Sequence, residues 1–377
     1  MNFAFFIHSL ASDWNHGNAH FVRGVLADLV RRGHSITVYE QQDNWSRWHL
    51  ARDHGDDATR AYLEVYPELR GLEHQYELQR DDVMHARDQL DLPNLLTEVD
   101  AVIVHEWTPP SVVQAIGDYR KTAGDFTLLF HDTHHRIVSE PQAMERFDLS
   151  GYDGVLAFGN VLREAYEQRG FAGRAWTWHE AADTHVFYPH DFDGEKQDLC
   201  WVGNWGDNER TAELHEFMLG PAKALGLTGT IHGVRYPDDA KQAVADAGLS
   251  YGGYLPNFRA PDLFARHHVT VHVPRRYYVT SLPGIPTIRP FEALACGIPL
   301  VSSPWSDAEN LFRVGRDFLM VDNGAAMTDA LRRITKEPAF AADLAAGGLE
   351  TIKARHTCAH RTNELLAVLD ELQPAIA

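Results

Sequence analysis

The stretch TIRPFEALACGIPLVSS, residues 287–303, sets Arg289 and Glu292 around the expected start of a short helix. Pro290 suits the first helical position, because it lacks an N–H and its fixed φ already fits the turn, and this makes Arg289 the N-cap. Gly297 is typical of the left-handed residue that ends a helix. Since the amides of the loop and first turn are free donors at the positive end of the helix, the segment predicts a phosphate site.

Arginines gather just before this helix. Residues 269–292 contain Arg275, Arg276 and Arg289 against the single acid Glu292, whereas the whole chain has a formal net charge of -19. Guanidinium groups and amides together suit a diphosphate. Glu292 could then accept hydrogen bonds from both hydroxyls of a ribose. Two plainer interpretations stay open: Glu292 only favours the positive end of the helix, and the arginines only form surface ion pairs.

Composition narrows the class of protein. The 377 residues, 44% hydrophobic and 23% charged, suit a globular chain of two domains. The negative net charge makes nucleic acid an unlikely partner. Three widely spaced cysteines, Cys200, Cys296 and Cys358, indicate a reducing compartment. The first residues, MNFAFFI, lack the basic region of a signal peptide, and no run is long enough to span a bilayer. We therefore expect a cytoplasmic monomer or homodimer.

Two series of strand-like runs predict the fold. The first comprises FAFFI, SITVYE, AVIVHE, FTLLFHD and GVLAFG; the second comprises LCWVGN, GTIHG, SYGGYL, VTVHVP, IPLVSS and FLMV. Helical patterns separate the runs, and in HFVRGVLADLVRRGH the residues Val22, Leu26 and Leu29 recur at helical spacing before Gly33. Alternation of this kind is typical of parallel sheets covered on both faces. The sequence thus predicts an α/β protein with two doubly wound, Rossmann-like domains facing a central cleft.

Two other segments interrupt or join these series. Residues 41–100 carry 14 Asp and Glu against 6 Arg and predict extra helices at one edge of the first sheet. The polar, turn-rich residues 183–198 predict the linker. We expect an N-terminal domain over 1–190, a second domain over 191–355 and a last helix within 356–377. Polar residues follow most strands, and because ligands bind beyond the carboxyl ends of such strands, these residues should converge at the site.

Several motifs occur in one order along the chain: SDWNHGNAHFVRGVLADLVRRGHSITVYE, VLREAYEQRG, HEAADTHVFYP, WVGNWGDNER, YGGYLPNF, VHVPRR, RPFEALACGIPLVSS and ARHTCAHR. RPFEALACGIPLVSS resembles the nucleotide-sugar signature of glycosyltransferases of the GT-B fold, and the whole set is most similar to their CgeB-like, spore-maturation group. The resemblance covers almost the whole chain. It implies a GT-B fold, transfer of a sugar from a nucleotide-diphosphate sugar to a hydroxyl-bearing small molecule, glycan or protein, and a last helix that crosses back to the first domain.

The resemblance also implies roles for particular residues. Glu292 would hold the ribose, and the diphosphate loop would comprise Pro286, Thr287, Ile288 and Arg289. Arg210 and Arg275 would stand near the leaving phosphate, while Gly203 and Asn204 would let their loop approach the donor. No cofactor or metal is implied, and a UDP-sugar is the expected donor. Tyr254 or Leu255 would line the base pocket; core packing is the alternative.

The first domain would bind the acceptor. The residues expected there are Gly17, Asn18, His20 and Trp107. A general base near neutral pH is most often a histidine. We rank His131 first, with Asp132, His16 and His20 as the other candidates.

One position departs from the related enzymes. The commoner retaining enzymes carry a carboxylate eight residues before the one at Glu292, and here Gly284 stands at that place. Contact with the transferred sugar and the stereochemical outcome therefore stay open. So do three other functions: a nucleotide-sugar epimerase, a binding protein that has lost transfer, and a metallohydrolase built on HDTHH and HEW, although no HExxH helix supports the last.

Overall fold

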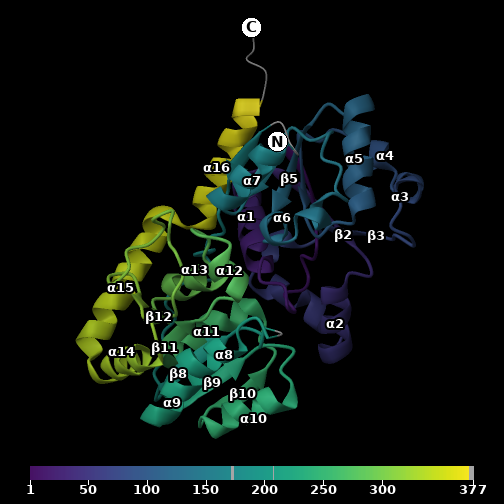
Figure 1. Ribbon diagram of the computed structural model, residues 1–377. Helices are drawn as coiled ribbons and strands as arrows, with labels where there is room; N and C mark the ends of the chain where they lie inside the picture. Colours follow the sequence, from purple (N-terminus) through teal and green to yellow (C-terminus); the bar gives the residue numbers. More distant parts are fainter. Residues whose placement is uncertain (171–173, 207, 373–377) are drawn as a thin grey trace. The chain divides into compact units, whose positions relative to one another are not determined.

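The computed structural model describes residues 1–170, 174–206 and 208–372, and it shows two parallel sheets, each in its own compact unit (Figure 1). The first unit comprises residues 1–179 and 359–377, and the second comprises 180–358. These boundaries differ from the predicted ones at 190 and 355. The difference has a physical cause: Ala182 and Thr357 pair the two crossing segments in a parallel bridge, and His356 Nε2 lies 2.9 Å from the carbonyl oxygen of Leu311 in the second unit.

The first sheet has seven parallel strands in the order β3-β2-β1-β4-β5-β6-β7. All five predicted runs of this series are strands. Two short strands at the sheet edges were missed: β3, inside the acidic segment, has mostly polar residues, and β7 is only three residues long. The strands are β1 (Asn2–Ile7), β2 (Ser35–Gln41), β3 (Glu73–Tyr76), β4 (Ala101–His105), β5 (Thr127–Asp132), β6 (Gly154–Ala157) and β7 (Ala175–Thr177).

Helices follow the strands of this unit. Val22, Leu26 and Leu29 are buried on α1, which confirms the predicted helix, and Gly33 beyond its end has a φ of +84°. The acidic segment forms the expected extra helices. The helices, with 3-10 turns marked η, are α1 (Ala19–Arg31), α2 (Trp45–His54), η1 (Asp56–Glu64), η2 (Pro67–Leu69), α3 (Val83–Gln89), α4 (Leu92–Leu95), α5 (Pro110–Thr122), α6 (Arg136–Ser139), η3 (Pro141–Met144) and α7 (Asn160–Arg169).

The second sheet has six parallel strands in the order β10-β9-β8-β11-β12-β13, and all six match predicted runs. This is the Rossmann order, in which the first strand of the unit lies in the middle of the sheet. The strands are β8 (Gln197–Val202), β9 (Gly229–His232), β10 (Ser250–Gly253), β11 (His267–His272), β12 (Leu300–Ser302) and β13 (Leu319–Met320).

Helices α14 and α15, drawn in yellow-green in Figure 1, pack against α9 and α13 of the same unit. A π-helical turn, η4, precedes Pro221, whose missing N–H interrupts the α-helical bonding. The helical elements are α8 (Thr211–Leu214), η4 (His215–Leu219), α9 (Gly220–Leu225), α10 (Asp238–Asp246), η5 (Asn257–Arg259), α11 (Ala260–Ala265), α12 (Arg276–Thr280), α13 (Ile288–Ala295), α14 (Gly324–Lys336) and α15 (Pro338–Arg355).

The last helix, α16 (Cys358–Leu372), contacts the first unit. Trp178 Nε1 donates to the carbonyl of Arg361 at 2.8 Å, and Arg361 Nε donates to the carbonyl of His179 at 2.8 Å. Residues 373–377 of the predicted C-terminal segment lie outside the described residues. Within the described chain, no helix combines the length and the apolar character needed to cross a bilayer.

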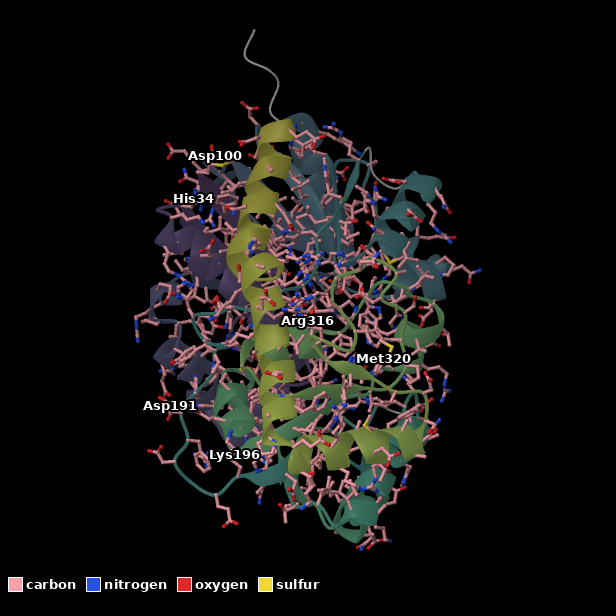
Figure 2. All side chains as sticks on the ribbon, turned by 90° about the vertical axis from the view of Figure 1, so that its left-hand side faces the viewer. His34, Asp100, Asp191, Lys196, Arg316 and Met320 are labelled. Carbon is pink, nitrogen blue, oxygen red and sulfur yellow. The ribbon has the colours of Figure 1, made fainter. Side chains whose placement is uncertain are left out.

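Two surface features are visible in Figure 2. His34 and Asp100 lie at the amino edge of the first sheet, where Asp100 accepts from the N–H of Asn2 at 2.6 Å. Asp191 and Lys196 lie in an exposed loop that belongs to the predicted linker. The candidate site residues lie elsewhere, at the carboxyl edges of the sheets.

Each sheet has one switch point. On one side of it the strands follow one another outwards to one edge of the sheet, and on the other side they follow one another outwards to the opposite edge. In the first sheet it falls between β1 and β4, and in the second between β8 and β11. Ligands of doubly wound folds bind beyond the carboxyl ends of the strands at this point. A ligand site is therefore expected at the loops after β1, β4, β8 and β11.

Candidate active site

Three arginines gather at the switch point of the second sheet. Asn204, in the loop after β8, links two of them: its Oδ1 accepts from Arg210 Nη2 at 2.9 Å and from Arg275 Nη2 at 3.1 Å. Arg210 also donates to the carbonyls of Asn204 (2.7 Å) and Val273 (3.0 Å), and its guanidinium lies over the ring of Trp201. The loops after β8 and β11 are thus held together by guanidinium groups.

In this cluster the three arginines outnumber the described carboxylates that pair with them. Arg275 pairs with Glu209 at 3.0 Å and Arg289 pairs with Glu292, but the buried Arg210 has no carboxylate partner among the described residues. Burial, followed by repulsion from Arg275, lowers the pKa of Arg210 to about 10. The Nε atoms of Arg210 and Arg289 are buried and find no acceptor in the described chain. An anion would satisfy both the charge and the donors.

The helix that carries Glu292 begins earlier than predicted. Thr287 is the N-cap of α13 and Ile288 its first residue, so the assignment of Arg289 as N-cap was wrong. Pro290 is the third residue, which is still within the first turn, where no N–H is required. The side chain of Thr287 does not cap the helix. The N–H groups of Ile288 and Arg289 therefore stay available as donors, since no described residue accepts from them.

Glu292 is fully buried on α13. One carboxylate oxygen accepts from Asn257 Nδ2 at 2.6 Å, and the other accepts from Arg289 one turn earlier on the helix. A carboxylate has about four acceptor positions, so its two oxygens can accept more than one hydrogen bond each. Asn257, 35 residues away in the sequence, was not predicted as part of the site.

The remaining predicted donor-side residues lie around this cluster. Pro286 is buried and Thr287 is half-buried, with its Oγ1 3.1 Å from His272 Nε2. The carbonyl of Gly203 accepts from Trp201 Nε1 and from Tyr236 Oη, and a Cβ at Gly203 would lie 2.8 Å from the Trp201 ring. Tyr254 and Leu255 are half-buried in the loop after β10.

His272, the last residue of β11, was missed although it stands in the quoted motif VHVPRR. Its Nδ1 lies 2.9 Å from Ser302 Oγ, and its Nε2 lies beside Thr287. Burial, followed by the charges of Arg210 and Arg289, lowers its pKa to about 3. His272 is therefore neutral at pH 7, and it connects β11, β12 and the loop before α13 without adding charge.

This lowered pKa predicts an acid-sensitive contribution to stability. Below pH 6.5 the unfolded chain protonates His272 while the folded chain does not, so stability is lost as pH falls from 6.5 towards 3. His272→Gln removes the titration and keeps a polar side chain. We expect the wild type to lose about 1.4 kcal/mol more per pH unit than this variant between pH 6 and pH 4.5. Urea unfolding at several pH values measures the slopes.

His268→Gln, at an exposed position of the same strand, is the control and should keep the wild-type slope. Equal slopes for all three proteins would contradict the assignment to His272.

Gly284 has a φ of +89°, and a Cβ there would lie 2.5 Å from Glu309 Cγ. Its N–H donates to the carbonyl of Ser306 at 2.6 Å. The backbone and Glu309 thus require glycine where the related enzymes carry a carboxylate.

Gly284→Ala should therefore destabilise the protein by about 2–3 kcal/mol, of which the backbone accounts for about 1 kcal/mol and the clash for the rest. Gly315→Ala isolates the backbone term, since Gly315 has a φ of +87° and nothing within 4 Å of its Cβ position. When Gly284→Ala is combined with Glu309→Ala, the part of the lost stability that comes from the clash with Glu309 should return. Urea unfolding measures each difference, and an alanine at 284 no worse than one at 315 would contradict the close approach.

Buried histidines and carboxyls occupy the switch point of the first sheet. His8 follows β1, and His105 ends β4 and is followed by Glu106. His105 Nε2 lies 2.7 Å from Asn18 Nδ2. His105 Nδ1 lies 2.7 Å from Glu106 Oε2 but without the alignment of a hydrogen bond, because that oxygen finds no hydrogen-bond partner among the described residues. Thr133 donates to Glu106 Oε1 at 3.2 Å.

The predicted bases lie on β5 beside this group. His131 is buried between the rings of His105 and Trp178, and its Nε2 has no hydrogen-bond partner in the described chain. Asp132 accepts from Tyr166 Oη at 2.6 Å and from the N–H of His134 at 2.8 Å. Burial lowers the pKa of His131 well below its usual value. Burial, followed by the charge of Glu106, raises the pKa of Asp132 to about 7.

The predicted acceptor-side residues differ in exposure. Gly17 is exposed in the loop after β1, and Trp107, after β4, is 37% exposed. Asn18 is buried against His105, and His20 is buried in the first turn of α1. Trp107 and Asn18 are thus brought to the group at the switch point, whereas His20 is 1% exposed and is covered by the fold. Among the described residues no group of three His, Cys, Asp or Glu side chains is arranged to hold a metal ion.

Comparisons with known proteins bear on the fold and on the second unit. Residues 210–367 match the family model described as glycosyl transferase-like. No curated protein matches the chain significantly.

Solved structures match nearly the whole chain. Sucrose-phosphate synthase from Thermosynechococcus elongatus has 14% identity and a TM-score of 0.67, with 99% of each chain covered. Anabaena HepE in complex with UDP and glucose has 14% identity and a TM-score of 0.63, over 99% of this chain and 100% of that one. T4 phage BGT in complex with UDP and Mn2+ has 11% identity and a TM-score of 0.62, over 98% and 100%. The predicted fold class is confirmed: two Rossmann-like units of the GT-B type.

Proposed function

We propose that the chain is a glycosyltransferase, which moves a sugar from a UDP-sugar to a hydroxyl group of an acceptor. One observation carries the proposal: Arg210, Arg275 and Arg289 gather at the switch point of the second sheet, and the described residues pair only two of them with carboxylates. A diphosphate would supply the missing charge and accept from the buried Nε atoms. The match of residues 210–367 to the glycosyl transferase-like family supports the same assignment.

The reaction needs stabilisation of the leaving nucleoside diphosphate. Arg210 and Arg275 would face its developing negative charge, and the N–H groups of Ile288 and Arg289 would add fixed donors. Glu292 would accept from the ribose hydroxyls, with the base near Tyr254 or Leu255. Since arginines and amides can carry this charge, we propose that transfer requires no metal.

The first unit would provide the acceptor side. In an inverting reaction a base removes the acceptor proton, and it works best with a pKa near the operating pH. Asp132, with a pKa raised to about 7, fits this requirement better than His131, whose pKa is lowered. We retain His131 as a contact to the transferred sugar. Trp107, Asn18 and Gly17 would line the acceptor site.

Two similar proteins suggest the donor. The HepE and BGT structures contain UDP by their descriptions, and HepE also contains glucose. We propose that this chain also binds UDP. The arginine cluster and Glu292 suit the diphosphate and the ribose of any ribonucleotide, and the choice of uracil as the base follows from the two similar structures. From the motif order we further propose that the chain is similar to the CgeB-like group within the fold.

Thermal stabilisation by UDP, GDP, dTDP and ADP tests the proposal first, and UDP is expected to raise Tm most. Transfer is then measured with UDP-sugars and a panel of acceptors, with EDTA or Mn2+ added. Activity that persists in EDTA would support the metal-free mechanism. Epimerisation of the nucleotide sugar without an acceptor would replace transferase by epimerase, and nucleotide binding without any turnover would indicate a binding protein.

A further inference from the structure

Arg136 presents an unused hydrogen-bonding edge in the first unit. It is the first residue of α6 and is 9% exposed, and its guanidinium lies over the ring of Trp107, 4.7 Å from the centroid. Its Nε and Nη2 are both buried and find no acceptor in the part of the chain that the structure describes. These two nitrogens share one edge of the guanidinium, and their parallel N–H bonds match the two oxygens of a carboxylate or phosphate.

The groups that face Arg136 do not neutralise it. Burial raises the pKa of Glu106 to about 8 although Arg136 opposes the shift, and Asp132 has a pKa of about 7. Neither carboxyl forms an ion pair with Arg136. His105 has a pKa lowered to about 3, by burial and then by Arg136, so it is neutral. No described carboxylate thus pairs with the guanidinium, and a buried charge of this kind calls for a counter-ion.

The surroundings favour a ligand that also has an apolar face. The Trp107 ring contacts the rings of His8 and His134 at 5.5 Å, and the ring of Trp45 lies 5.7 Å from that of His8. Trp107 is 37% exposed, so the ring on which Arg136 lies is itself partly accessible to solvent. Aromatic walls with few, fixed polar groups are typical of small-ligand sites.

We infer that Arg136 binds an anionic group, a carboxylate or a phosphate, carried by the acceptor, with Trp107 against the rest of that molecule. The inference rests on the proposed function only in identifying the ligand as the acceptor. Anion binding at Arg136 can be measured without any transfer. It also explains why a chain with a net charge of -19 keeps, over the ring of Trp107, a buried arginine that no described carboxylate pairs with.

Calorimetry on the full chain at low ionic strength tests the inference with four probes: glucose, glucuronate, glucose 6-phosphate and inorganic phosphate. We expect at least one acidic sugar to bind roughly 10-fold or more tightly than glucose. Arg136→Gln should remove this preference. Arg136→Lys keeps the positive charge but lacks the two parallel N–H donors, so it should retain part of the preference for the acidic sugar. This variant also shows whether the loss in Arg136→Gln is only a folding defect. Arg146→Gln is the matched control, because exposed Arg146 also lies over a ring, that of Phe147.

The outcomes separate this inference from the proposed function. Equal affinity for glucose and both acidic sugars, or a preference that survives Arg136→Gln, would overturn it even if transfer is observed. Inorganic phosphate binding as tightly as the acidic sugars would indicate a free-anion site and overturn the acceptor assignment. Preference for an acidic sugar that depends on Arg136, without any transfer activity, would support the anion site while the proposed function fails.

Discussion

Replacing Arg210 by alanine is expected to lower kcat/KM for the UDP-sugar by roughly 100-fold or more. Among the described residues the Arg210 guanidinium has no carboxylate partner, and an interaction with charge that develops in the transition state is commonly worth this much. The same change leaves the carbonyls of Asn204 and Val273 without their donor, so binding of UDP itself should also weaken. Steady-state kinetics and calorimetry with UDP give the two effects separately.

Arg276→Ala is the matched control for this experiment. Arg276 stands next to the cluster in sequence, but its side chain is 55% exposed and pairs with Glu213 at a distance of 3.5 Å. We expect its removal to change kcat/KM less than about 2-fold, since an exposed ion pair contributes little. Thermal unfolding of both variants shows whether each is folded at the assay temperature. If Arg210→Ala is folded and as active as Arg276→Ala, the diphosphate does not bind at this cluster.

Most of the fold followed from local patterns. Strands that are buried on both faces, such as β4 and β5, appear in the sequence as unbroken apolar runs. Such runs predicted these two strands, and strand-like runs predicted all six strands of the second sheet. The edge strand β3 was missed because its residues, EHQY, have no apolar run. Glu73 in that strand instead pairs with Arg47, a contact made through space that no spacing in the sequence reveals.

The site was only partly predictable for the same reason. Motif residues such as Arg210 and Glu292 could be proposed because each stands in a recognisable local context. Their partners come from distant segments: Asn257 bonds Glu292, and His272 lies beside Thr287. Arg136 carries no motif at all. Its interest arises from burial and from the absence of an acceptor for two of its nitrogens in the described chain, and both are properties of packing.

Glu292→Gln and Glu292→Ala distinguish two roles of Glu292. The sequence predicts that it binds the ribose, whereas the structure shows that it pairs with Arg289 and Asn257 in the interior. A carboxylate that holds the ribose would affect nucleotide binding, but Glu292 also pairs in the interior with Arg289 and Asn257. Removing one partner of a buried ion pair commonly costs about 3–5 kcal/mol. We therefore expect Glu292→Ala to lower the free energy of unfolding by about this amount, and Glu292→Gln, which keeps an acceptor, to lower it less. Glu213→Gln, at the exposed pair with Arg276, should change stability by less than about 1 kcal/mol.

Binding of two ligands to Glu292→Gln separates the duties. UDP contains the ribose and the diphosphate, whereas inorganic pyrophosphate has only the phosphates. If Glu292 binds the ribose, the variant should lose roughly 10-fold or more in affinity for UDP and little for pyrophosphate, because its lost hydrogen bonds involve a charged acceptor. If Glu292 acts only by holding Arg289, both affinities should fall together, since both ligands depend on the guanidinium. Equal losses measured by calorimetry would thus reduce Glu292 to a positioning residue, whereas a selective loss for UDP would establish it as the ribose-binding carboxylate.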